Sequence, residues 1–455
     1  MTSAQRLLGE NLIVFALGVG LLVNLGVAPT FARLRQLWPV GYLIGLSVVG
    51  IVGAMLAVIS IPFPPLALIV GSIASIALAS RRIAHRPTAA RERMQRIDRV
   101  AASVGVPVLT VAIAWATAQY SSKPLGAWDG WAIWGLKARA IAALGASSHA
   151  VLGSSAYDFS HLEYPLFLPA LEALGIRAAG GYQSQLVVLQ CVLVGVAGLL
   201  AIFGLLRDRV RPAVLWPFLL MIASAPTVFG QLASGYADMP MALFLARGFV
   251  AGGCWLLESQ GPWLILATLF FAAAALCKDE GDLFVAAAYL GLALAARRRR
   301  IAVLLSAATT AILLVPWRIF IAVHGFSPSD FQLAKSFDPS WVGNRLDRAP
   351  TAASDLIVHA VDVHQYALLL PVGVAALAVG FAFRARPLAV YGTAFALFST
   401  FGLLWIYVIS WIPLGIYLPQ TDGRTTAGVI LSVAALAPLL VSEAWSNLAG
   451  GRVAD

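Results

Sequence analysis

Long apolar segments and short polar intervals alternate along this chain from end to end. The apolar runs are about 17–25 residues long, and each is enough to cross a hydrocarbon core of about 30 Å as a helix. They predict spans near residues 11–29, 40–60, 63–80, 100–118, 184–206, 213–229, 238–256, 262–277, 282–296, 301–323, 365–383, 388–411 and 425–442. Because only helices and closed barrels satisfy their backbone groups in lipid, the pattern predicts an all-α polytopic membrane protein of about 13 transmembrane helices.

The arginine-rich intervals all fall on one side of the membrane if these spans alternate. They lie at residues 33–35, 81–99, 207–211, 297–300 and 384–386. Cytoplasmic loops are enriched in lysine and arginine, so the N-terminus is expected outside and the C-terminus inside. The two long intervals, roughly residues 119–183 and 324–364, then lie on the outer side.

Composition agrees with a membrane protein. The chain is 60% hydrophobic and 11% charged, whereas a soluble domain carries about 25% charged residues. A net charge of +10 raises the question of nucleic acid. Because the arginines lie in short loops between spans, we expect them to set membrane orientation and expect no nucleic-acid partner. The three cysteines lie in apolar runs without paired spacing, which is typical of buried packing residues.

The first polar stretch of chemical interest is AWDGWAIWGLKARA, residues 127–140. Its tryptophans recur every third residue, which predicts an amphipathic helix in the outer interface, with Lys137 and Arg139 reaching lipid phosphates. Asp129 has two interpretations. It caps the helix N-terminus, or it accepts a proton from a substrate hydroxyl, a role favoured by the low dielectric constant between indole rings.

Two further outer motifs carry acidic residues beside tyrosines. SHLEYPLFLP contains Glu163 and Tyr164 before a proline that fits a first helical turn, so Glu163 either caps that helix or contacts substrate. SGYADMP places Tyr236 and Asp238 at the outer mouth of a span. Asp238 has a capping explanation, but a third carboxylate on the same face favours a shared polar pocket.

Three cations complete the candidate set. CKDEGDLF interrupts two apolar runs, and Lys278 and Glu280 in so short a turn indicate a site at the membrane interface. Arg318 lies a turn or two inside the outer end of its span, where snorkelling alone would satisfy it. Arg424 lies on the outer side, against the positive-inside bias, which favours a role as a phosphate ligand.

These motifs resemble those of the GT-C superfamily of membrane glycosyltransferases, in particular bacterial relatives of the protein O-mannosyltransferases and of the lipid A aminoarabinose transferase. The resemblance is carried by WDGW, EYPLFLP, GYADMP, KDEG and TDGRTT and extends from about Trp128 to Leu440. It implies a GT-C-like transmembrane catalytic region at residues 100–455, with residues 1–99 as an N-terminal three-span addition and cytoplasmic basic loop. Two features depart from the family: the adjacent Asp-Glu pair of protein mannosyltransferases is absent, and Asp279 stands where asparagine is expected.

The resemblance implies an inverting transfer from a polyprenyl-phosphate sugar to a lipid, glycan or protein acceptor. The site would face the periplasm or exterior of a bacterial inner membrane. Asp129 would be the base, and Lys278, Arg318 and Arg424 would bind the donor phosphate. The remaining candidates, expected to bind substrate, are Glu163, Tyr164, Tyr236, Asp238 and Glu280.

No cofactor is required by this scheme, although a divalent cation held by Asp129 and Asp238 would be compatible with it. The rival class is a transporter or lipid flippase for a polyprenyl-linked or anionic substrate, because membrane-embedded charges also mark substrate paths. A scaffold without chemistry is a third alternative.

Overall fold

The computed structural model describes residues 2–84, 95–121, 123–327 and 330–451. Within these residues the protein is helical and contains no strand, apart from one isolated bridge between Thr30 and Ala84. The predicted all-α class is therefore confirmed. Residues 85–94, the middle of the predicted basic loop, lie outside the described residues.

The helices fall into three groups by length. The long ones are α1 (Ser3–Asn24), α2 (Phe31–Val58), α3 (Pro65–Arg82), α4 (Arg96–Ser121), α8 (Ser184–Leu206), α11 (Asp238–Glu258), α14 (Arg300–His324), α19 (Arg386–Ile409) and α21 (Ala427–Gly451). The intermediate ones are α5 (Gly135–Leu144), α7 (Phe167–Ala179), α9 (Pro212–Ser224), α10 (Pro226–Ser234), α12 (Gly261–Ala275), α13 (Glu280–Ala295), α16 (Arg348–Val361), α18 (Leu369–Ala382) and α20 (Leu414–Thr425). The shortest are η1 (Asp129–Trp134), η2 (Gly145–Ser147), α6 (His149–Leu152), η3 (Ser155–Ser160), η4 (Arg297–Arg299), η5 (Leu333–Phe337), α15 (Pro339–Gly343) and α17 (Val363–Tyr366).

Nine helices in the described parts of the chain are long and apolar enough to cross a membrane, or ten if α9 and α10, which meet at a 47° bend, form one span. A multi-pass membrane protein is therefore confirmed at this level. The predicted spans at 262–277, 282–296 and 365–383 correspond to α12, α13 and α18, which have 15, 16 and 14 residues. At 1.5 Å per residue such helices cover about 21–24 Å, less than the hydrocarbon core, so the count of thirteen stays a prediction.

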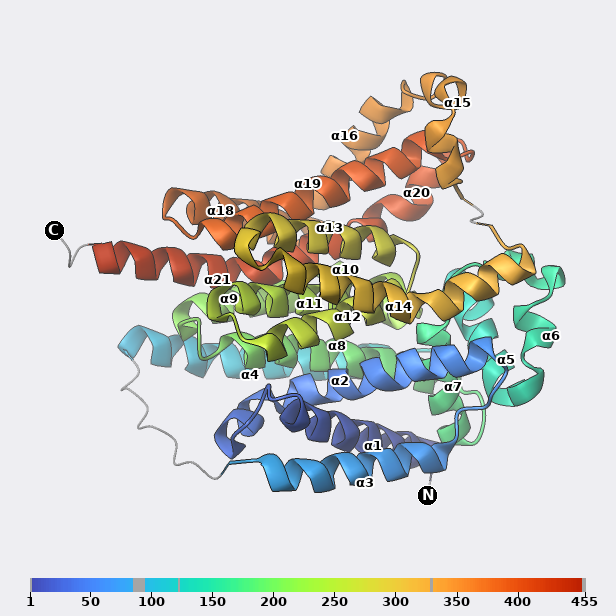
Figure 1. The fold of residues 1–455 in the computed structure, drawn as a ribbon, viewed down its shortest axis with the longest axis horizontal. Coiled ribbons are helices and arrows are strands. Elements are labelled where there is room, and N and C mark those ends of the chain that lie inside the picture. Colours follow the sequence, from blue (N-terminus) through green and yellow to red (C-terminus); the bar gives the residue numbers. More distant parts are fainter. Residues whose placement is uncertain (1, 85–94, 122, 328–329, 452–455) are drawn as a thin grey trace.

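The long helices lie roughly side by side, with α11 in the middle of the bundle (Figure 1). The central position of α11 depends on small residues. A Cβ added to Gly248 would lie 2.6 Å from the ring of Phe271 on α12, so only glycine permits this approach. Close packing through small residues is a main source of association between helices in lipid, where no hydrophobic driving force acts between them.

Arginine-rich segments that are far apart in sequence meet at the end of α11. Arg33 pairs with Asp208 at 2.5 Å, Arg209 pairs with Glu258, the last residue of α11, and Arg299 donates to the last-turn carbonyl of Trp255 at 3.3 Å. We call this end of the bundle the basic end. It agrees with the common side predicted for these loops.

The opposite end of the bundle lies about 30 Å away along the 21 residues of α11. There α11 begins at Asp238, and the short helices α5, α6 and α7 gather (right side of Figure 1). We call it the acidic end, because the candidate carboxylates lie there.

Candidate functional site

Asp129 begins the short π-helix η1, which continues into α5. The start of η1 is pressed against the end of α10, since a Cβ added to Gly130 would lie 2.1 Å from the carbonyl oxygen of Ser234. Glycine at this position therefore lets Asp129 lie beside the segment that connects α10 to α11. π-Helical turns are rare and are frequent at functional sites.

The three tryptophans of this stretch do not share one face. Trp128 and Trp131 are 56% and 40% exposed, and their ring centroids lie 4.9 Å apart. Trp134 is buried and stacks on Tyr164 with a centroid distance of 5.5 Å. The prediction of one continuous amphipathic helix with its three tryptophans in the interface is wrong, because the π-helical turn is wider than an α-turn and rotates Trp134 toward the protein interior.

Lys137 is buried and does not reach for lipid phosphates, so that prediction is wrong too. Its ammonium group donates to the carbonyl oxygens of His161 and Tyr164, the latter at 3.2 Å. Burial lowers the pKa of Lys137 to about 7. Arg139 also turns back, donating to the carbonyl oxygen of Gly135 at 3.1 Å. Both cations therefore fasten the segment before α7 and the η1–α5 turn rather than extending outward.

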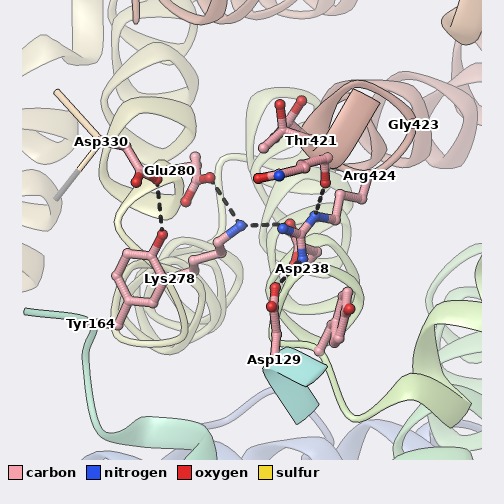
Figure 2. Close-up of polar contacts among 12 residues, drawn as sticks. Asp129, Tyr164, Asp238, Lys278, Glu280, Asp330, Thr421, Gly423 and Arg424 are labelled. Carbon is pink, nitrogen blue, oxygen red and sulfur yellow. Dashed lines mark hydrogen bonds and ion pairs between the residues drawn. The ribbon is translucent and has the colours of Figure 1, made fainter. Parts of the chain in front are cut away.

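Five of the predicted site residues form one continuous chain of charges at the acidic end (Figure 2). Asp129 accepts from Arg424 at 2.5 Å, and Arg424 lies 3.7 Å from Asp238. Asp238 accepts from Lys278 at 2.7 Å, and Lys278 lies 3.0 Å from Glu280. Three carboxylates thus alternate with two cations. We call this set the ion-pair chain.

The middle of the ion-pair chain is sealed and its two ends are accessible. The side chains of Asp238 and Lys278 are 2% and 5% exposed, those of Arg424 and Asp129 are 18% and 21%, and that of Glu280 is 15%. Burial disfavours the charge on Lys278, but Asp238 and Glu280 outweigh it and raise its pKa, so the ammonium group stays charged. Asp238 therefore serves to hold two cations in place, and Asp129 and Glu280 are the carboxylates that a ligand can reach.

The capping alternatives for the three carboxylates are wrong. Neither η1, α7 nor α11 has a side-chain hydrogen bond at its N-cap. Asp129 and Asp238 are bonded to cations instead, and Glu163 lies 3.1 Å from the ring nitrogen of His161. Asp129 and Asp238 are thus held by tertiary contacts, and Glu163 by a local contact with His161.

Arg424 is oriented from several sides. Its guanidinium group lies 4.7 Å from the ring centre of Tyr236, and its Nε donates to the carbonyl oxygen of Gln420 at 3.0 Å. The hydroxyl of Tyr366 donates to the carbonyl oxygen of Gly423 at 2.7 Å, which holds this end of α20. The motif TDGRTT therefore contributes an arginine whose side chain is fixed by packing. Nothing is described of the side chain of Asp422 in that motif.

A pocket opens beside Glu280. It is lined by carboxylates, tyrosines and a few apolar groups: Glu163, Tyr164, Asp279, Glu280, Asp330, Phe331, Leu403, Ile406, Tyr407, Tyr417 and Thr425. A concave site with aromatic walls and several hydrogen-bonding groups suits a small polar ligand. Three predicted substrate-binding residues line it, namely Glu163, Tyr164 and Glu280.

Several residues of this pocket were not predicted from the sequence. Asp330 accepts from the hydroxyl of Tyr164 at 3.4 Å (Figure 2), and Tyr407 and Tyr417 come from α19 and α20. The only available signal was position, because all three lie at or near outer ends of predicted spans. Residue type alone did not distinguish them from ordinary interfacial tyrosines and loop carboxylates.

Arg318 is not brought into the ion-pair chain. Its guanidinium group donates to Asp282, lies 4.0 Å from Asp279, and is 47% exposed. Arg318 is not among the residues that line the pocket. The structure therefore groups Lys278 and Arg424 as the two central cations and leaves Arg318 at the margin.

Because of Asp279, we expect the free energy of unfolding to depend on pH. Burial raises its pKa from 3.8 to about 7, partly opposed by Arg318. Because the folded protein then holds a proton that the unfolded chain releases, the contribution of Asp279 to the free energy of unfolding is full below about pH 4 and is lost as the pH rises toward 7. Wild type should therefore lose up to about 1.4 kcal/mol per pH unit relative to Asp279→Asn in this window, as measured by thermal unfolding in detergent. Equal pH profiles for the two proteins would contradict the assignment.

A protonated Asp279 also bears on the family resemblance. It presents one donor and one acceptor to its surroundings, as the expected asparagine would. Below about pH 7, aspartic acid at position 279 therefore carries nearly the same charge as the expected asparagine.

The carboxylates that were considered for a divalent cation are both paired with cationic side chains, Asp129 with Arg424 and Asp238 with Lys278. In the residues that the structure describes, no group of three or more His, Cys, Asp or Glu side chains is arranged to hold a metal ion. Comparisons of the chain with protein-family models, with curated proteins and with solved structures find no match. The GT-C resemblance therefore stays a prediction from the motifs.

Proposed function

We propose that this protein is a membrane-embedded inverting glycosyltransferase that moves a sugar from a polyprenyl-phosphate donor to an acceptor at the acidic end of the bundle. The observation that carries the proposal is the ion-pair chain beside the pocket at Glu280. It combines two fixed cations with an accessible carboxylate, and the neighbouring pocket is lined by carboxylates and tyrosines that can hydrogen-bond the hydroxyls of a sugar. We propose further that this end faces the periplasm or exterior of a bacterial inner membrane.

The amphiphilic character of such a donor fits the surroundings of the pocket. Leu403 and Ile406 form an apolar wall on α19, and the same helix exposes Leu397 and Phe401, which are 66% and 63% accessible. A polyprenyl tail can lie along this apolar surface while its phosphate stays at the interface. The sugar then points toward the carboxylates and tyrosines of the pocket.

The proposed chemistry is a single displacement. Asp129 accepts the proton of an acceptor hydroxyl, and the acceptor oxygen forms a bond with the anomeric carbon of the sugar. The bond between that carbon and the phosphate oxygen breaks, and its electron pair leaves with the polyprenyl phosphate. Lys278 and Arg424 stabilise the charge that develops on this oxygen, since charge-assisted hydrogen bonds are strong where water is excluded.

The Arg424–Asp129 contact suggests how donor binding prepares the base. Without ligand, the carboxylate of Asp129 is occupied by its 2.5 Å contact with Arg424. A donor phosphate competes for the same guanidinium group and releases the carboxylate. The base thus becomes available when the donor is in place.

The other residues have supporting roles in this scheme. Glu163, Tyr164 and Glu280 line the pocket and can hydrogen-bond sugar hydroxyls. Tyr236 holds Arg424 through its ring, and Asp238 orients both cations. Arg318 contacts Asp282, outside the ion-pair chain, so in this scheme it acts only on a donor that is approaching the site.

The test is a transfer assay with purified protein in lipid vesicles and a panel of radiolabelled polyprenyl-phosphate sugars. We expect labelled acceptor and free polyprenyl phosphate to appear together in equal amounts. Movement of the intact donor between leaflets without product would favour the transporter or flippase alternative. Neither transfer nor movement of any donor, with the protein folded, would contradict both.

A further inference from the structure

A pocket of about 450 Å³ lies at the basic end, at the opposite end of the bundle from the ion-pair chain. Its lining residues come from α4, α9, α21 and the segments before α4 and α9. Helix α9 contacts both α4 and α21 and lies between them (left side of Figure 1). Ligand pockets in proteins commonly have volumes of about 300–1,000 Å³, so this pocket is large enough for a small ligand or a headgroup.

The pocket presents positive charge to a ligand. Arg209 and Arg211 line it, and no carboxylate is among the described residues that do so. The side chain of Arg209 is 14% exposed and pairs with Glu258. The side chain of Arg211 is 40% exposed and is therefore the more accessible cation. Because the carboxylates that pair with these arginines lie outside the lining, an anion in the pocket would meet the two guanidinium groups first.

Arg211 is held in place from one side. Oδ2 of Asp98 accepts from Nη2 of Arg211 at 3.0 Å and from its Nε at 3.3 Å. Oδ1 of Asp98 accepts from the backbone N–H of Ala213 at 3.1 Å, in the first turn of α9, and Oε1 of Gln95 accepts from Nη2 of Arg211. In the described structure these bonds leave Nη1 of Arg211 and the amide nitrogen of Gln95 as donors for a ligand. A fixed guanidinium group with a neighbouring amide donor suits a phosphate.

The same pocket has an apolar wall, formed by Ile97, Val214, Val441 and Trp445. Ile97 and Trp445 are 61% and 62% exposed, and they belong to α4 and α21, which both lie in candidate spans. Exposed tryptophans near the ends of spans are typical of the level of lipid headgroups. A ligand in this pocket therefore contacts arginines and exposed apolar side chains at the same time, as an amphiphile would.

We propose that this pocket binds an anionic phospholipid of the phosphatidylglycerol class, with its phosphate at Arg211 and an acyl chain along Ile97 and Trp445. A headgroup with an ammonium group fits less well, because no carboxylate among the described lining residues would meet that group. Basic pockets between transmembrane helices on the cytoplasmic side typically bind anionic headgroups, and the basic end is the side that the arginine-rich loops predict to be cytoplasmic. The proposal is independent of glycosyl transfer.

The test measures lipid retention by native mass spectrometry of full-length protein from nanodiscs that contain equal amounts of phosphatidylglycerol and phosphatidylethanolamine with identical acyl chains. Wild type should retain phosphatidylglycerol preferentially. Arg211→Gln should reduce that preference about tenfold or more, because it removes a charge-assisted bond to the phosphate. The matched control is Arg298→Gln, which removes an exposed arginine at the same end but outside the lining and should keep the preference. An equal reduction in both variants would indicate diffuse attraction and overturn the site.

A second pair of variants decides the matter if Arg211→Gln fails to fold, since that substitution leaves the buried Asp98 without its cation. Ser446 is exposed and lines the pocket, so Ser446→Glu adds a carboxylate there without breaking an ion pair. It should abolish the preference for phosphatidylglycerol. Ser446→Gln adds the same bulk without the charge and should keep the preference.

A competition arm identifies the source of the phosphate. Dissolved glycerol 3-phosphate should not displace phosphatidylglycerol from wild type, because it lacks the acyl chains that contact the apolar wall. Displacement at a concentration equal to that of the lipid would overturn the lipid assignment in favour of a soluble phosphate. Equal retention of the two lipids by wild type, or an unchanged preference in Ser446→Glu, would overturn the site altogether.

Discussion

Asp129→Asn should lower the rate of sugar transfer by about 10²–10⁴-fold, the usual contribution of a general base. The substitution keeps the size of the side chain and its contact with Arg424 but removes the ability to accept a proton. Donor binding should be unchanged or tighter, because a neutral amide competes less with the donor phosphate for Arg424 than the carboxylate at 2.5 Å does. The measurements are single-turnover transfer in vesicles and equilibrium binding of the same donor.

The matched control is Asp158→Asn, which changes an exposed carboxylate on η3 at the same end of the bundle. This variant should transfer at the wild-type rate. If Asp129→Asn transfers as fast as Asp158→Asn, Asp129 has no role in the chemistry. If donor binding collapses together with transfer, Asp129 acts by shaping the donor site instead.

Asp238→Asn should lower the free energy of unfolding by about 3–5 kcal/mol, as is typical when one partner of a buried ion pair is removed. Asp238 is 2% exposed and compensates Lys278 and Arg424 together. Its loss leaves Lys278 buried with only Glu280, which lies 3.0 Å away. Chemical or thermal unfolding in detergent at pH 7 measures the change. The double variant Asp238→Asn/Lys278→Met should recover part of the loss, because it removes the uncompensated charge as well.

Asp282→Asn is the matched control for this prediction. It breaks the contact with Arg318, in which the two side chains are 47% and 30% exposed. Ion pairs at such exposure contribute about 0–1 kcal/mol, so this variant should unfold almost like wild type. Equal effects of Asp238→Asn and Asp282→Asn would mean that the ion-pair chain is not sealed from water.

The five residues of the ion-pair chain were predicted individually, but their pairing was not. Each was selected from its sequence as a charge at the outer end of an apolar run, because a charge there requires an explanation that a loop charge does not. Their contacts were not predictable. Asp129 and Arg424 are 295 residues apart, and nothing local to either motif indicates that they meet.

The residues that were predicted wrongly show the limit of helical periodicity. Lys137 and Trp134 were assigned outward positions from a regular helix, but the π-helical turn of η1 rotates the segment that follows it. Lys137 consequently bonds to the carbonyl oxygens of His161 and Tyr164 inside the protein. The π-helical turn coincides with close packing against α10 at Gly130, which no pattern in residues 127–140 reveals.

The sequence by itself determined the class of the protein, its apolar helices and the common side of its arginine-rich loops. These features follow from lipid burial and charge, which act on each segment separately. The tertiary structure decided which charges pair, that Arg318 stands apart, and that Asp330 and two tyrosines join the pocket. Those outcomes depend on how closely helices far apart in the chain can approach. That approach is set by small residues and by the shapes of facing side chains, and it has no local signature in the sequence.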